Sequence, residues 1–270
     1  MTRNGTGPIA SVHVFTFRSP RDAGRSLACD RGRLARVPGL RFARLIFVGA
    51  RWWEAMTPGW VDPRRQLAIC VWDEEAALER FRERSPIGRS WREQTDQHCE
   101  VRMAPFRTHG TYRGLEPLAG LRGQTAPAGP VAMLTFANIP VRGLPYFWRG
   151  IRRSTGSLLT SQGLIAAAAG PERWFRGGMT FTIWESLPEA LGFSYRRDPH
   201  RGIVKSVHEH ERLIDSMFLR LRPYAVDGSW FRWSRFATGF ADFARSMPSA
   251  QAPGPPAATP PGPAARSPTA

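Results

Sequence analysis

The pattern of apolar and polar positions repeats once along the chain. In each half an apolar run ends in a tryptophan, LAICVW at Trp72 and MTFTIW at Trp184. An amphipathic helical pattern follows, a proline breaks it, and a second helical pattern leads to a last strand. The same spacing matches Phe81 with Phe193, and the halves end in Gly-Thr-Tyr and Gly-Ser-Trp. We interpret this repetition as an internal duplication.

The first half predicts the element order β-α-β-β-α-β. Runs rich in β-branched and aromatic residues indicate strands, and apolar residues three or four apart indicate helices. The predicted strands are 12–17, 40–48, 66–72 and 100–107, and the predicted helices are 24–37, 74–84 and 88–97. Pro105 predicts an edge position for the last strand, because proline has no N–H to donate to a neighbour. This order is typical of a ferredoxin-like unit.

The second half predicts the same order again. Its predicted strands are 131–136, 163–170, 179–184 and 217–221, and its predicted helices are 144–157, 187–196 and 201–214. The alanines of the 163–170 run weaken its strand pattern. Two such units can pack together and enclose an apolar pocket between sheet and helices. The expected fold class is therefore α+β, with tandem ferredoxin-like repeats forming a dimeric α/β-barrel-like, pseudo-dimeric domain and a disordered C-terminal tail.

Composition divides the chain into five segments. They are a first ferredoxin-like half (11–113), a linker (114–130), a second ferredoxin-like half (131–230), an aromatic and basic segment (231–247) and a Pro/Ala-rich tail (248–270). The aromatic and basic stretch favours a helix docked on the core, with contact to a membrane surface as the alternative. The tail has eight prolines in 23 residues, which predicts disorder because it offers little apolar surface to bury.

Charge and cysteine content restrict the setting of the protein. Of the 38 basic residues all but Lys205 are arginines, and the net charge is +16. Such a surface attracts anions, including acidic proteins and lipid headgroups, although scattered arginines are usually solvated. Three widely spaced cysteines form no CxxC pair, which favours reduced thiols. The N-terminus has no apolar leader pattern and no apolar run is long enough to cross a bilayer, so we expect a cytoplasmic protein, with peripheral membrane contact left open.

The absence of several sequence motifs argues against several classes of chemistry. The chain has no dinucleotide fingerprint, Walker loop, H-E-x-x-H motif or nucleophile elbow, and we expect no nucleic-acid partner. His208 and His210 are two residues apart, so they point to different sides of a helix and suit a solvated surface. His200 follows Pro199 at a predicted helix start. A neutral imidazole there can bind iron, and the alternative is a histidine exposed to solvent.

Several segments together resemble the spheroidene monooxygenase family of carotenoid biosynthesis. They are LARVPGLRFARLIFVG, QLAICVWDEEAALERF, PVAMLTF, FTIWESLPEALGFSYRRDPHRGIVKSV and the terminal Gly-Ser-Trp, spread over most of residues 11 to 230. The resemblance implies a dimeric α/β-barrel-like fold and a haem (heme) cofactor with its iron. It also implies electrons from reduced ferredoxin and oxygen insertion into a long apolar carotenoid-like substrate, giving hydroxy and keto products. An acidic ferredoxin would suit the positive charge.

The resemblance selects candidate site residues in the second half. His200 matches the histidine after a proline in the family, and the first half has Ile87 there, so we expect His200 to be the axial metal ligand. Nearby Arg196, Arg197, Arg201 and Lys205 are candidate partners of the haem propionates, with ordinary solvation as the alternative. Trp184, Phe193 and Tyr195 are expected to flank the substrate pocket, or else to pack in the core.

Two other hypotheses about the function remain open when the sequence alone is considered. One is a cofactor-free oxygenase of the same fold, and the other is a non-catalytic barrel protein that binds haem, lipid or RNA. Fold class alone does not choose among them. A haem absorption band in the purified protein would separate the haem monooxygenase from the cofactor-free oxygenase. The substrate, the electron donor and the oligomeric state stay undetermined.

Overall fold

The computed structural model describes residues 7–49, 61–119, 121, 128–145, 155–172, 177–196, 215–232 and 234–247. Eight strands form one antiparallel sheet in the order β2-β3-β1-β4-β8-β5-β7-β6. Their bounds are β1 (Ile9–Phe17), β2 (Leu40–Gly49), β3 (Val61–Trp72), β4 (Thr95–Gly110), β5 (Val131–Asn138), β6 (Leu164–Glu172), β7 (Gly177–Trp184) and β8 (Asp215–Gly228). Each half contributes four strands in the same relative order, which confirms the tandem ferredoxin-like fold.

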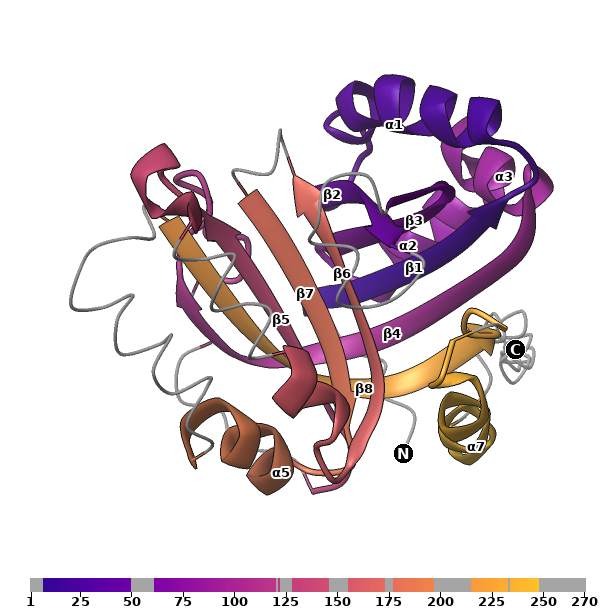
Figure 1. Ribbon diagram of the computed structural model, residues 1–270. Helices are drawn as coiled ribbons and strands as arrows, with labels where there is room; N and C mark the ends of the chain where they lie inside the picture. Colours follow the sequence, from indigo (N-terminus) through magenta and orange to yellow (C-terminus); the bar gives the residue numbers. More distant parts are fainter. Residues whose placement is uncertain are drawn as a thin grey trace, which may run out of the picture.

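The helices lie outside the curved sheet (Figure 1). They are α1 (Pro20–Leu34), α2 (Glu75–Arg84), α3 (Pro86–Glu93), α5 (Leu187–Leu191) and α7 (Ala237–Ser246), with a 3₁₀ turn η1 (Val141–Gly143) and a π-helical turn η2 (Gly192–Arg196). A serine followed by a proline marks the N-terminus of both α1 and α3. Ser19 precedes Pro20 and accepts the backbone N–H of Asp22, and Ser85 precedes Pro86 and accepts that of Ile87.

The two half-sheets join through their fourth strands. β4 pairs antiparallel with β8 from Cys99 opposite Gly228 to Gly110 opposite Met217. The expectation that Pro105 marks an edge is therefore wrong, since β4 lies in the middle of the sheet. The register shifts between Pro105 and Arg107, and this irregularity accommodates the missing N–H inside a paired strand.

The two outer strands, β2 and β6, approach each other and bring the sheet toward a closed barrel. A Cβ added at Gly170 in β6 would lie 1.9 Å from the carbonyl oxygen of Phe47 in β2, so only glycine fits there. Arg44 Nε of β2 lies 3.4 Å from Glu172 Oε1 of β6, and the Tyr112 hydroxyl donates to Glu172. A glycine contact and a small polar cluster thus connect the outer strands.

The sheet separates two apolar cores. The barrel interior contains side chains from both halves, for example Phe42 of β2 against Phe136 of β5 with ring centroids 5.4 Å apart. A second core lies between the first half-sheet and helices α1 to α3 and includes Trp72, Phe81 and Trp91. The alanine-rich run is a strand, as its place in the repeat predicts, because Ala166 and Ala168 belong to the interior core.

The segment after the second half docks on the barrel. Phe240 and Phe243 of α7 are buried, and the Phe240 ring lies 4.9 Å from that of Trp230. The predicted helix 201–214, much of the 144–157 helix, residues 120 and 122–127 of the linker and the tail from 248 onward lie outside the described residues. The three cysteines form no disulfide. Of the helices that the structure describes, none is both long and apolar enough to span a bilayer.

Candidate functional site

The two tryptophans occupy equivalent places in the two halves. Trp72 ends β3 opposite Ile9 of β1, and Trp184 ends β7 opposite Val131 of β5. Both are buried and each packs on the phenylalanine nine residues later, at 5.1 Å for Phe81 and 5.5 Å for Phe193. The duplication inferred from the sequence is therefore present in the strand pairing and in the packing.

The strand registers allow the two halves to be compared position by position. Residues directly opposite each other on neighbouring strands share a face of the sheet. On the helix-covered face of the first half, one row across β2, β3, β1 and β4 is Leu45, Ala68, His13 and Glu100. The equivalent row across β6, β7, β5 and β8 is Ala169, Thr180, Thr135 and Phe218.

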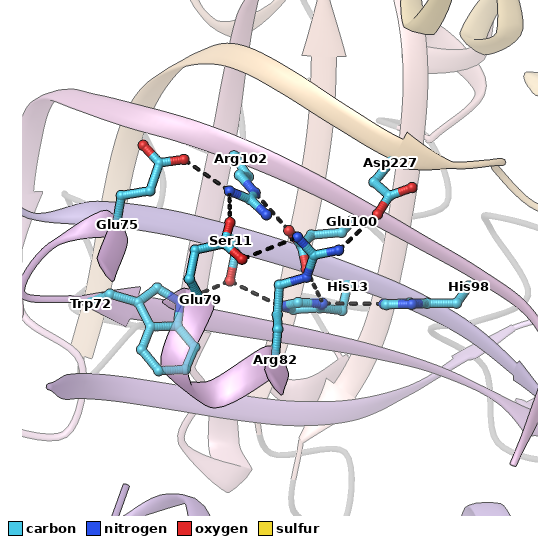
Figure 2. Close-up of polar contacts among 10 residues, drawn as sticks. All are labelled: Ser11, His13, Trp72, Glu75, Glu79, Arg82, His98, Glu100, Arg102 and Asp227. Carbon is cyan, nitrogen blue, oxygen red and sulfur yellow. Dashed lines mark hydrogen bonds and ion pairs between the residues drawn. The ribbon is translucent and has the colours of Figure 1, made fainter. Parts of the chain in front are cut away.

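In the first half this face carries a buried run of polar side chains (Figure 2). Trp72 Nε1 donates to Ser11 Oγ at 2.9 Å, Ser11 Oγ lies 2.9 Å from His13 Nε2, and His13 Nδ1 lies 3.2 Å from His98 Nε2. Since the Ser11 oxygen accepts from Trp72, its own hydrogen is free to point at His13 Nε2. His13 then carries its proton on Nδ1 and donates to His98, so both imidazoles are neutral.

Charged groups from α2 complete this network. Arg102 Nε donates to Glu100 Oε1 at 2.7 Å, and its Nη1 reaches Glu75 of α2 at 2.9 Å and also contacts Glu79. Arg82 of α2 lies 3.4 Å from Glu100 Oε2 and 2.9 Å from Asp227 of β8. Glu100 and Arg102 are almost fully buried, so the ion pairs hold α2 against the sheet and leave no room for a ligand on this half.

Buried His13 and half-buried His98 make the stability of the first half sensitive to acid. Burial, with Arg82 and Arg102 nearby, lowers the pKa of His13 to about 3. Burial, with His13 nearby, lowers that of His98 to about 3 as well. Unfolded histidine takes up a proton near pH 6.5. The neutral pair therefore contributes its full stability above that pH, and the contribution is lost as the pH falls toward 3.

We expect the free energy of unfolding to fall by about 2 kcal/mol per histidine between pH 6.5 and pH 5, because the unfolded chain binds protons that the folded chain does not. Urea denaturation at a series of pH values measures this slope. His98→Gln should reduce it, whereas replacement of the exposed His109 by Gln should leave it unchanged. Equal slopes in all three proteins would show that His98 is not held neutral by the fold.

The second half has small side chains where the first half is filled. In the next row of the first half stand Phe47, Gln66, Phe15 and His98. The equivalent residues are Pro171, Gly178, Ala137 and Ser216. We call Thr135, Ala137, Ala169, Gly178, Thr180 and Ser216 the small-residue face. Gln66, Phe15 and His98 of the first half correspond to Gly178, Ala137 and Ser216, so less side-chain bulk projects from the sheet on this half.

Apolar and cationic side chains flank the small-residue face. Phe218 is 37% exposed, a large exposed fraction for an aromatic ring in a sheet, and Thr135 and Thr180 are only half-buried. Trp184 and Phe193 lie on the same side of the sheet, where α5 and η2 follow β7. Arg220 follows Phe218 on this face. A flat apolar group with an anionic edge would find suitable partners here.

The structure describes only part of the predicted site. It brings Trp184 and Phe193 into contact, and it places Tyr195 in η2, with the Tyr195 side chain outside the described residues. His200, Arg197, Arg201 and Lys205 lie outside the described residues altogether. Within the described part of the chain no three His, Cys, Asp or Glu side chains gather as a metal site. Sequence reasoning missed the small-residue face, although the alanine run of β6 was its visible signal.

The chain is similar to proteins of known activity. Spheroidene monooxygenase of Rubrivivax gelatinosus is 30% identical over 195 residues, which cover 72% of each chain. Spheroidene monooxygenase of Rhodobacter capsulatus is 22% identical over 227 residues, covering 83% of this chain and 93% of that protein. No family model matches.

Solved structures agree on the fold. An aldoxime dehydratase crystallised with butyraldoxime has a TM-score of 0.50 and 12% identity, covering 80% of this chain and 79% of that one. A likeness at that identity shows the shared architecture alone. The sequence match is the stronger finding, since it extends through both halves of the sheet. By its identity to the Rubrivivax gelatinosus protein over most of both chains, this chain belongs to the spheroidene monooxygenase family and is a monooxygenase.

Proposed function

We propose that this monooxygenase is haem-dependent and inserts oxygen into a long apolar, carotenoid-like substrate to give hydroxy and keto products. Two relatives of this chain are named spheroidene monooxygenase, which supports a substrate of that class. The observation that carries the proposal is the small-residue face, where one half of a duplicated sheet has lost the bulk that fills the other half. The proposed site is on the second half only.

The residues of this face fit a haem. A planar macrocycle needs a wide apolar surface without projecting side chains, and Ala137, Ala169 and Gly178 supply it. Its propionates need cations, and Arg220 is a half-buried cation beside that surface. We propose His200 as the axial ligand and Arg197, Arg201 and Lys205 as further propionate partners, as the sequence suggests.

The chemistry divides between cofactor and protein. When bound, haem supplies the activation of molecular oxygen. The residues of this chain bind and orient the substrate and exclude water. We propose that Trp184 and Phe193, which are buried in contact with each other on the same side of the sheet, line the apolar pocket. An apolar polyene would be held there by dispersion contacts and by its removal from water. Reduced acidic ferredoxin is the proposed electron donor, since a chain of net charge +16 attracts an acidic protein.

An absorption spectrum tests the haem dependence. Full-length protein reconstituted with haemin should show a Soret band and, with reduced ferredoxin and oxygen, should convert an acyclic carotenoid to hydroxylated and then keto products. Oxygenation by a protein that binds no haem would favour a cofactor-free mechanism and contradict the proposal.

Single substitutions test the axial ligand. His200→Ala should abolish the Soret band or strongly weaken haem binding, because it removes the proposed iron ligand. His208→Ala and His210→Ala are the matched controls and should keep the band. Circular dichroism of each variant would verify that the fold persists. A normal band in His200→Ala with a lost band in His208→Ala would assign the ligand to His208.

A further inference from the structure

Arg220 has an equivalent in the first half of the duplication. Arg220 lies opposite Met133 of β5, two residues along from the pair of Val131 with Trp184. Arg102 lies opposite Ser11 of β1, two residues along from the pair of Ile9 with Trp72. The two arginines therefore occupy the same place on the same strand of each repeat, on the helix-covered face.

The partners of the two arginines differ. Arg102 is neutralised by Glu100 of β4 and by Glu75 and Glu79 of α2. At the equivalent positions the second half has Phe218 in β8 and Leu187 and Leu191 in α5. An apolar residue therefore stands at each of the three positions that hold a carboxylate in the first half. Among the described residues no carboxylate forms an ion pair with Arg220. The second half therefore has the cation without the three anions that accompany it in the first half.

A second cation lies beside Arg220. In the pairing of β4 with β8, Arg107 is directly opposite Arg220. Like charges at opposed positions of an antiparallel pair repel and destabilise the sheet. In the first half the neighbour of Arg102 on the adjoining strand is Ala225, so no such repulsion arises there. Two adjacent arginines with no anion from the described part of the chain form a site prepared for an external anion.

We propose that Arg220 and Arg107 bind the carboxylates of the haem, which rests on the proposed function and adds described residues to it. Arginine suits this role, because its planar guanidinium forms two parallel hydrogen bonds to a carboxylate. Both arginines lie in the row next to Phe218 and the small-residue face. The macrocycle would cover that face with its carboxylate edge toward β8 and β4. The substrate is a hydrocarbon in this proposal, so the cofactor is the source of the anion.

Haem titrations of the full-length apoprotein, followed by the Soret band, test this assignment. Arg220→Leu should weaken the affinity for haem about 10- to 100-fold, the effect of losing a charge-assisted bidentate contact. Haem dimethyl ester lacks free carboxylates, so its affinity should be the same for wild type and Arg220→Leu. Arg107→Leu should show the same pattern with a smaller loss, because Arg107 is exposed. Arg25→Leu, at an exposed position of α1, is the matched control of equal charge change and should alter neither affinity.

The outcomes separate this inference from the proposed function. Unchanged haem affinity in Arg220→Leu, with a normal wild-type band, would overturn the carboxylate assignment alone. Equal losses for haem and its ester would show that Arg220 shapes the fold and does not contact carboxylates. A lower melting temperature of the Arg220→Leu apoprotein with unchanged haem affinity would assign Arg220 to a carboxylate of the chain itself. A wild-type protein without a haem band would overturn both proposals.

Discussion

Replacing either Trp72 or Trp184 by alanine should lower the free energy of unfolding by about 3 to 5 kcal/mol. Both indoles are buried. The ring of Trp72 packs against Phe81, and the ring of Trp184 packs against Phe193. Alanine would remove the ring and leave a cavity that the surrounding strands can fill only in part. The two losses should be similar because the two sites are equivalent in register and packing.

Phenylalanine substitutions separate the ring from its hydrogen bond. Trp72 Nε1 donates to Ser11 and Trp184 Nε1 donates to Thr182, each at 2.9 Å. Trp72→Phe and Trp184→Phe keep an aromatic ring and should cost less than the alanine variants, with the lost hydrogen bond contributing about 1 kcal/mol. Urea denaturation measures all four variants. A near-neutral alanine variant in either half would contradict the structural equivalence of the two tryptophans.

Glu100→Gln should destabilise the protein by about 3 to 5 kcal/mol, because it removes one charge from a buried network and leaves the others uncompensated. Glu100 is 1% exposed and lies between Arg102 at 2.7 Å and Arg82 at 3.4 Å. Glutamine has nearly the same shape, so the loss reports charge and not volume. Its amide group would also place donor hydrogens near guanidinium donors.

An exposed ion pair at the start of α2 provides the control. Glu74 is 43% exposed and lies 3.3 Å from Arg80, which is 52% exposed. Glu74→Gln should change the free energy of unfolding by less than about 1 kcal/mol, since water screens a surface pair. Both variants can be measured by urea denaturation at pH 7. Similar small effects for Glu100 and Glu74 would mean that the interior network is as well solvated as the surface.

The order of elements could be predicted because it depends on local patterns. The period of apolar residues identified the strands ending at Trp72 and Trp184, and the repeat identified the alanine run as a strand. Pro105 misled the prediction, since its effect depends on an irregularity of register that only the pairing with β8 reveals. The pairing of β4 with β8 has no local signature, because it joins residues more than a hundred positions apart.

The first-half network could not be predicted for a different reason. Glu100 and Arg102 alternate with Val101 and Met103, a pattern that ordinarily means a solvated strand face. Burial of the charges arises because α2 covers that face and supplies matching charges of its own. The small-residue face had only the alanine run of β6 as a local signal, since Thr135, Ala137 and Gly178 stand out only when they are compared with their first-half equivalents.

The two halves that pair through β4 and β8 belong to one polypeptide, so their equivalent positions can hold different residues. If the two halves were separate copies of one chain, joined by the same strands about a two-fold axis, every substitution would appear at both sites at once. A change from Glu100 to phenylalanine would then open one site and break the charge network of its mate. Within one polypeptide the equivalent of Glu100 is already Phe218, while Glu100 itself is kept. Covalent linkage thus permits one half to keep a buried charge network while the other carries the proposed haem site.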